Sequence, residues 1–94
     1  MDGIELFPSL SHCIETAARE EFWNSVNQYM EGGQEDKKLE DRIELLKAFL
    51  ESVDFKKLRS QSEGHLVEGK QVKFVISRKE GKPIYEMVVI NATD

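Results

Sequence analysis

Residues 72–89 read VKFVISRKEGKPIYEMVV and carry the clearest structural pattern in the chain. Apolar and polar side chains alternate on both sides of segment 79–82, as is typical of two strands joined by a tight turn. The favoured pairing puts six apolar side chains on one face: Ile76 with Tyr85, Phe74 with Met87, and Val72 with Val89. A shift by one residue would place Glu86 on that face, where an unpaired carboxylate is costly. We therefore predict a hairpin with a loop of two or four residues.

The motif before this hairpin suggests a further strand. Glu68-Gly69-Lys70 and Glu80-Gly81-Lys82 recur along the chain, each followed two positions later by a β-branched residue. If the first motif is also a turn, His65–Val67 forms a leading strand and the sheet becomes a three-stranded meander. An isolated two-stranded hairpin is only marginally stable in water. Hairpin and meander both remain open from the sequence.

Segment 36–52 has the cleanest helical pattern. Its apolar residues recur every three or four positions along one stripe, formed by Leu39, Ile43, Leu46, Leu50 and Val53. Leu45 and Phe49 widen this stripe beyond the roughly 100° of an ordinary surface helix. We therefore predict a long helix packed between two layers.

A first helix is predicted over residues 10–31, with Ser9 or Ser11 as its cap and Gly32-Gly33 at its end. Two apolar stripes on this segment are rotated by roughly a third of a turn: Leu10, Cys13, Ile14, Ala17 and Ala18, then Phe22, Val26, Tyr29 and Met30. The helix therefore bends or breaks near Arg19–Glu21, or its two halves face different neighbours.

A short third helix is predicted over Phe55–Glu63, capped by Asp54 and ended by Gly64, although an extended segment is the alternative there. The resulting fold class is α+β: two long N-terminal helices and a short third helix on a small C-terminal antiparallel sheet. Ninety-four residues make one domain, 1–94. Within it, residues 1–9 are a flexible N-terminus, 10–63 are helical and 64–91 form antiparallel strands.

The charge of the chain is divided unevenly. Residues 1–54 carry five Lys or Arg against thirteen Asp or Glu, whereas residues 55–94 carry eight against five, so the net charges are −8 and +3. The single cysteine, Cys13, cannot form an internal disulfide, and no secretory signal or apolar membrane span is evident. We expect a cytoplasmic protein.

No catalytic motif is present, so an enzyme is the least supported class. Gly32-Gly33 lacks the lysine and hydroxyl residue of a phosphate loop. His12, Cys13 and Glu15 cluster as metal ligands might, but Cys13 lies on the apolar stripe and is expected to be a small buried hydrophobe. His65 is expected at the surface. We predict no catalytic residue, cofactor or metal.

Residues 22–30 form an uncharged run, FWNSVNQYM, in a chain that is 33% charged. Aromatic residues and methionine are enriched at protein interfaces, where charges are depleted. One interpretation is therefore a partner-binding or dimerising helix, whose contact residues would be Phe22, Trp23, Tyr29 and Met30. The other interpretation is that this segment packs inside its own domain.

The basic half gives a DNA-binding alternative. The order helix, helix, short helix, hairpin resembles a winged helix-turn-helix domain, with residues 55–63 as recognition helix and the hairpin tip 78–82 on phosphates. The contact residues would be Lys56, Lys57, Arg59, Arg78, Lys79 and Lys82. The acidic net charge and the thin apolar face of the third helix count against it.

The leading hypothesis is a small interaction or regulatory module that acts through protein–protein contacts, including self-association as a homodimer. The basic hairpin of one copy would then face the acidic helices of the other. A second alternative is a small-molecule binder between the first helix and the sheet. The residues that would line its site are Phe22, Trp23, Tyr29, Phe74 and Tyr85.

Overall fold

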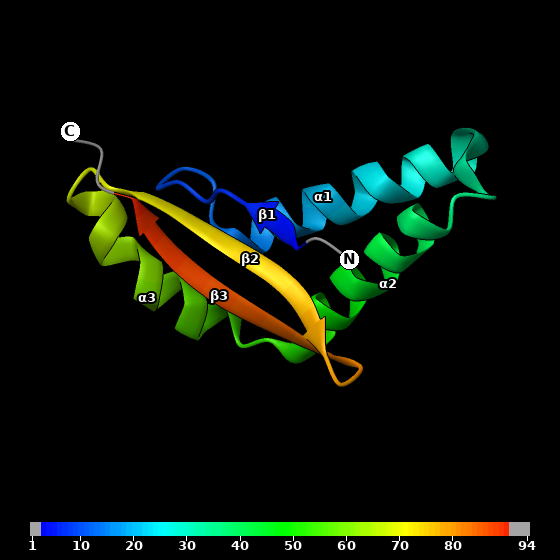
Figure 1. Cartoon of the computed structure of the whole chain (residues 1–94). Helices are drawn as coiled ribbons and strands as arrows, with labels where there is room; N and C mark the ends of the chain where they lie inside the picture. Colours follow the sequence, from blue (N-terminus) through cyan, green and yellow to red (C-terminus); the bar gives the residue numbers. More distant parts are fainter. Residues whose placement is uncertain (1–2, 91–94) are drawn as a thin grey trace.

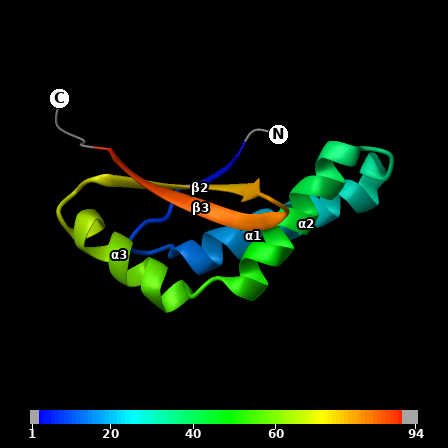
Figure 2. The same cartoon turned by 60° about the horizontal axis from the view of Figure 1, so that its bottom comes forward.

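Two layers make up the structure, a computed structural model that describes residues 3–90. Three α-helices lie on one face of a three-stranded antiparallel sheet, and the other face of the sheet is uncovered by any helix (Figures 1 and 2). The predicted α+β class is therefore confirmed.

The predicted hairpin is confirmed in its register. Strands β2 (Gln71–Lys79) and β3 (Lys82–Ile90) pair one to one, and the predicted apolar pairs face each other. The loop has two residues, Glu80 and Gly81, with φ angles of 53° and 80°. Two positive φ angles define a type I′ turn, whose twist matches that of the flanking strands.

The third strand comes from the N-terminus. β1 (Ile4–Leu6) pairs with β2 on the side opposite β3, so the strand order is β1-β2-β3. The predicted leading strand His65–Val67 is wrong, because these residues form the last turn of a helix. Every second residue of β1 can form backbone hydrogen bonds with β2, so Pro8 would be the next after Ile4 and Leu6. Proline has no N–H to donate, and the strand ends before it. Part of the segment assigned to a flexible N-terminus is thus ordered in the sheet.

Helices α2 (Lys37–Ser52) and α3 (Phe55–Val67) begin where predicted. Asp36 and Asp54 cap them by accepting hydrogen bonds from backbone N–H groups in the first turn. The predicted end of α3 at Gly64 is wrong, because Gly64 lies inside the helix. Two residues after Gly64, Leu66 packs against the core and extends the buried stripe that begins at Leu58.

Helix α1 (Ile14–Gln28) begins four residues later than predicted and continues without a break through Arg19–Glu21. Ile14 and Ala18 lie in the core, whereas the second half of the helix contacts α2. The two halves therefore face different neighbours. The irregular part comes later, in the π-helical segment η1 (Tyr29–Gly33), where Gly32 has a φ of 139°.

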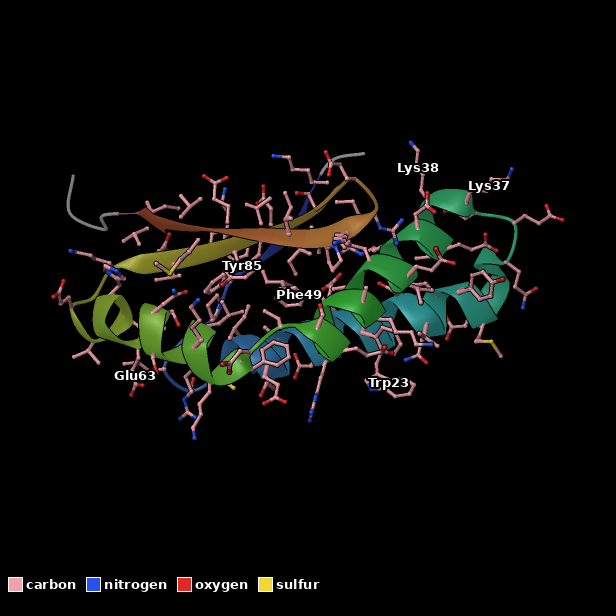
Figure 3. All side chains as sticks on the ribbon, turned by 90° about the horizontal axis from the view of Figure 1, so that it is seen from below. Trp23, Lys37, Lys38, Phe49, Glu63 and Tyr85 are labelled. Atoms are coloured by element: carbon pink, nitrogen blue, oxygen red, sulfur yellow. The ribbon has the colours of Figure 1, made fainter. Side chains whose placement is uncertain are left out.

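The core lies between the sheet and the helices, and Phe49 of α2 is near its centre. The Phe49 ring contacts Phe55 edge to face at 5.6 Å and Tyr85 at 6.2 Å between ring centroids. Figure 3 shows Phe49 and Tyr85 pointing toward each other between the two layers. Beyond the end of the sheet, the end of α1, η1 and the start of α2 project as an arm, residues 22–42 (Figures 1 and 2).

Candidate interaction surfaces

Polar contacts join α1 to α2 at the base of the arm. The guanidinium of Arg42 forms an ion pair with Glu21, and Arg42 Nε donates a hydrogen bond to Ser25 Oγ at 3.3 Å. Ser25 Oγ in turn donates to the backbone oxygen of Glu21 at 2.8 Å. Further out, the Tyr29 hydroxyl donates to Glu40 Oε1 at 3.0 Å, and this hydrogen bond raises the pKa of Tyr29. The arm is therefore fixed by its own side chains rather than by the sheet.

Trp23 lies on the side of the arm that points away from the sheet (Figure 3). Its side chain is 60% exposed and that of Met30, seven positions later, is 66% exposed. Asn27, one turn after Trp23, is also exposed. We call the surface formed by Trp23, Asn27 and Met30 the Trp23 face. It is an exposed apolar surface without a charged residue among its members.

The four predicted partner-binding residues are thus divided between two environments. Trp23 and Met30 are exposed. Phe22 is half-buried, packs against the core and contacts the Trp23 ring edge to face at 5.4 Å. Tyr29 is half-buried and bound to Glu40. The structure therefore presents Trp23 and Met30 to solvent, whereas Phe22 packs against the Trp23 ring and Tyr29 bonds Glu40.

The basic residues do not form one continuous surface. Lys56, Lys57 and Arg59 are exposed in the first turns of α3. The β2–β3 turn lies at the end of the sheet near α2, away from α3 (Figures 1 and 2). Arg78 beside this turn already faces Glu44 of α2 at 3.8 Å, and Lys79 and Lys82 are cross-strand neighbours.

The aromatic residues suggested for a ligand site lie in different environments. Phe74 is fully buried and packs on Tyr85, whereas Trp23 points away from the sheet. An open groove of about 780 Å³ lies elsewhere, between the segment after β1 and the turn that joins α3 to β2. Apolar residues in its lining include Phe7, Leu10 and Leu66.

Cys13 is not the buried hydrophobe that the sequence pattern indicates. It is half-exposed and occupies the N-cap position of α1, with its Sγ 3.3 Å from Thr16 Oγ1. Hydrogen bonds from the Thr16 hydroxyl and backbone lower the pKa of the Cys13 thiol, and Arg59 adds a smaller effect in the same direction. The thiol borders a shallow pocket of about 200 Å³ that Phe55 and Arg59 also line. This position was missed because the helix predicted from the sequence begins at residue 10, which places Cys13 inside the helix instead of at its N-cap.

Within residues 3–90, no three His, Cys, Asp or Glu side chains gather in a way that could hold a metal ion. His12 Nε2 lies 3.1 Å from Glu20 Oε2. In the same part of the chain, no helix combines the length and apolar character that crossing a membrane would require.

Fold and surfaces define a small α+β protein with a one-sided sheet and a projecting helical arm. One protein family has a model that matches residues 4–91, and the chain belongs to this family. This membership by itself assigns no activity or partner. Neither the curated proteins nor the solved structures contain a match to the chain.

Proposed function

We propose that this chain is a small cytoplasmic interaction module that binds a protein partner through the Trp23 face. The observation that supports the proposal is the exposure of Trp23 and Met30 on an arm already fixed by its own contacts. Large aromatic residues and methionine contribute most when they are buried at the centre of an interface. Because contacts within the arm already hold its backbone, burying this pair costs little backbone entropy.

The charges around the Trp23 face suggest the chemistry of the partner. Arg19 and Glu20 both lie one turn before Trp23, Arg19 forms an ion pair with Glu15, and Glu31 follows Met30; Arg19, Glu20 and Glu31 are exposed. A partner pocket that accepts the indole ring should therefore be apolar and have a basic rim, because opposite charges at the rim increase the association rate. The basic hairpin of a second copy is a weaker candidate, since its Arg78 already faces Glu44 in its own chain.

The experiment compares wild type with Trp23→Gln and with Leu10→Gln. Leu10 is the matched control, because it is an apolar residue 62% exposed outside the arm. A protein retained from lysate by wild type and Leu10→Gln but lost by Trp23→Gln is purified and titrated. Trp23 is the single tryptophan in the chain, so its fluorescence should shift to the blue on binding as the ring leaves water.

Two outcomes contradict the proposal. In one, Leu10→Gln loses the same protein, which would show general stickiness of exposed apolar residues. In the other, the emission of Trp23 stays unchanged at saturation. Circular dichroism of the variants shows whether either substitution alters the fold.

DNA binding is the alternative proposal and has less support, because α3 and the hairpin turn are apart (Figures 1 and 2). A titration with mixed-sequence duplex at low salt tests it, since phosphate affinity is greatest there. Binding that is lost on Arg59→Gln would favour DNA over a protein partner.

A further inference from the structure

Among residues 3–90, the sheet has one long free edge, formed by β3. Its neighbour β2 is the central strand, and the pairing of β2 with β3 continues one to one from Gln71–Ile90 to Lys79–Lys82. In a two-residue hairpin the pair beside the loop is hydrogen-bonded, and bonded pairs then alternate along the ladder. Ile84, Glu86 and Val88 therefore bond β2. The backbone N–H and C=O groups of three residues point to the free edge: Tyr85, Met87 and Val89.

This edge lacks the features that usually prevent strand addition. Proteins protect edges with bulges, prolines, charged side chains (lysine above all) or short strands. Here Lys82 and Pro83 protect the end beside the turn, and Glu86 is the one charged side chain between Ile84 and Ile90. The ladder contains no bulge between Ile84 and Ile90. The opposite edge of the sheet, by contrast, consists of the three-residue strand β1.

From Ile84 to Ile90, the outward face of β3 is apolar apart from one charge, Glu86. Ile84 and Ile90 are 42% and 39% exposed, and Val88 is half-buried between Glu86 and Ile90. On an antiparallel sheet with one face in water, the outward positions are normally polar. Glu86 lies opposite Val75 of β2, and within residues 3–90 it forms no ion pair. We call the outward side chains of Ile84, Glu86, Val88 and Ile90 the outward row. It contains a single unpaired carboxylate between apolar neighbours.

We propose that the free edge of β3, from Ile84 to Val89, binds an extended segment of a partner protein by antiparallel strand addition. That segment carries Lys or Arg opposite Glu86 and apolar residues opposite Ile84 and Val88. The backbone groups of Tyr85, Met87 and Val89 provide the hydrogen bonds, and the outward row selects the sequence. Glu86 and its partner form a non-hydrogen-bonded pair, in which side chains lie closest.

A second copy of β3 meets these requirements poorly. In an antiparallel pair of β3 strands, the register that sets Lys82 opposite Glu86 also sets Pro83 opposite Tyr85, and each such pair loses one donor. The register centred on Met87 keeps every donor but sets Glu86 opposite Val88. The register centred on Glu86 opposes two carboxylates, which is destabilising. A partner strand with a central basic residue avoids all three conflicts.

The test uses the synthetic peptide Thr-Val-Thr-Lys-Thr-Val-Thr and a matched peptide with Glu in place of Lys. Binding to the ¹⁵N-labelled protein is followed by amide chemical shifts and hydrogen exchange. Before peptide is added, the amides of Tyr85, Met87 and Val89 should exchange fast and those of Ile84, Glu86 and Val88 slowly. The Lys peptide should slow the first group and shift the amides of β3.

Charge reversal makes the test specific. Wild type should prefer the Lys peptide by about twofold to fivefold, and Glu86→Lys should prefer the Glu peptide by a similar factor. Glu86→Gln should show no preference. Glu86 is exposed, so these variants should keep the fold, and circular dichroism checks that they do.

Three results would overturn the proposal. The first is the absence of shifts in β3 up to about 1 mM peptide. The second is equal affinity of wild type and Glu86→Lys for both peptides. The third is a shift of the same amides with protein concentration alone, which would identify a second copy as the occupant. Shifts confined to the Trp23 face would also contradict it without affecting the proposed function.

Discussion

Cys13 illustrates how strongly a single residue depends on where its helix begins. Placed inside a helix, it lies on the apolar stripe with Ile14 and Ala17. At the N-cap, its Sγ lies 3.3 Å from the hydroxyl of Thr16. A helix N-terminus carries partial positive charge, which favours the thiolate. The same side chain therefore changes from packing residue to a polarised thiol.

The pKa of the Cys13 thiol should consequently be low enough to measure by alkylation. Thiolate is the reactive form, so the rate of reaction with iodoacetamide should reach half its plateau at a pH below the usual pKa of 9.0. Thr16→Val removes the hydroxyl bond, which is the largest cause of the shift, and should raise this midpoint. Thr16→Ser is the control that keeps it low. Identical midpoints in all three proteins would show that the Thr16 hydroxyl does not lower the pKa of the Cys13 thiol.

Glu80 is a second residue whose backbone conformation invites a test. Its φ of 53° is in the left-handed region, which costs most residues about 1–2 kcal/mol but asparagine and glycine less. Asn-Gly is the preferred pair for a type I′ turn. Glu80→Asn should therefore stabilise the protein by about 0.5–1 kcal/mol in urea unfolding. Gly81→Ala should destabilise it, and a loss of stability on Glu80→Asn would count against the turn assignment.

At the scale of elements, the arm depends on the polar contacts of Arg42. Arg42→Gln leaves Glu21 half-buried without its cation and removes the link to Ser25. We expect a loss of about 1–2 kcal/mol in urea unfolding, because a group that loses its partner keeps its desolvation cost. Hydrogen exchange should accelerate in the second half of α1 and the start of α2. The exposed Lys47→Gln on the same helix is the control and should change neither.

The elements predicted well are those whose residues repeat with one clear period. The β2–β3 register follows from the position of Glu86, and the place of α2 from its single apolar stripe. The strand β1 was missed because three residues carry no usable period, and its pairing with β2 spans almost the whole chain. The end of α3 was misplaced because a glycine weakens a helix locally, but the packing of Leu66 outweighs it.

The candidate surfaces were predictable only in part, because exposure is a tertiary property. An uncharged aromatic run fits both a core helix and a binding helix, and aromatic residues at helical spacing more often belong to a core. The extension of the arm past the sheet leaves Trp23 and Met30 in solvent (Figures 1 and 3). The free edge of β3 depends on β1 joining the opposite side of β2. Without that strand, either edge of the hairpin would look equally open.

At the scale of the whole molecule, the uneven charge of the chain is only partly compensated inside the fold. Five ion pairs between Lys or Arg and a carboxylate join residues in the described range 3–90. Two of them connect the acidic segment 1–54 with the basic remainder: Glu5 with Lys73 and Glu44 with Arg78. Both are at least partly exposed, and such pairs contribute about 0–1 kcal/mol. Most carboxylates in this range are therefore exposed to water and have no ion-pair partner within it.

Salt should accordingly stabilise this protein. Raising NaCl from about 0.01 M to about 0.15 M shortens the Debye length from about 30 Å to about 8 Å and screens repulsion among the carboxylates. The attraction lost from two exposed ion pairs is smaller. We expect the Tm to rise by several degrees, since about 1 kcal/mol corresponds to about 4–8 °C in a domain of this size. The double variant Glu31→Gln with Glu35→Gln removes two exposed charges and should show a smaller rise. A Tm that falls as NaCl is added would mean that attractive pairs between the two halves outweigh the repulsion.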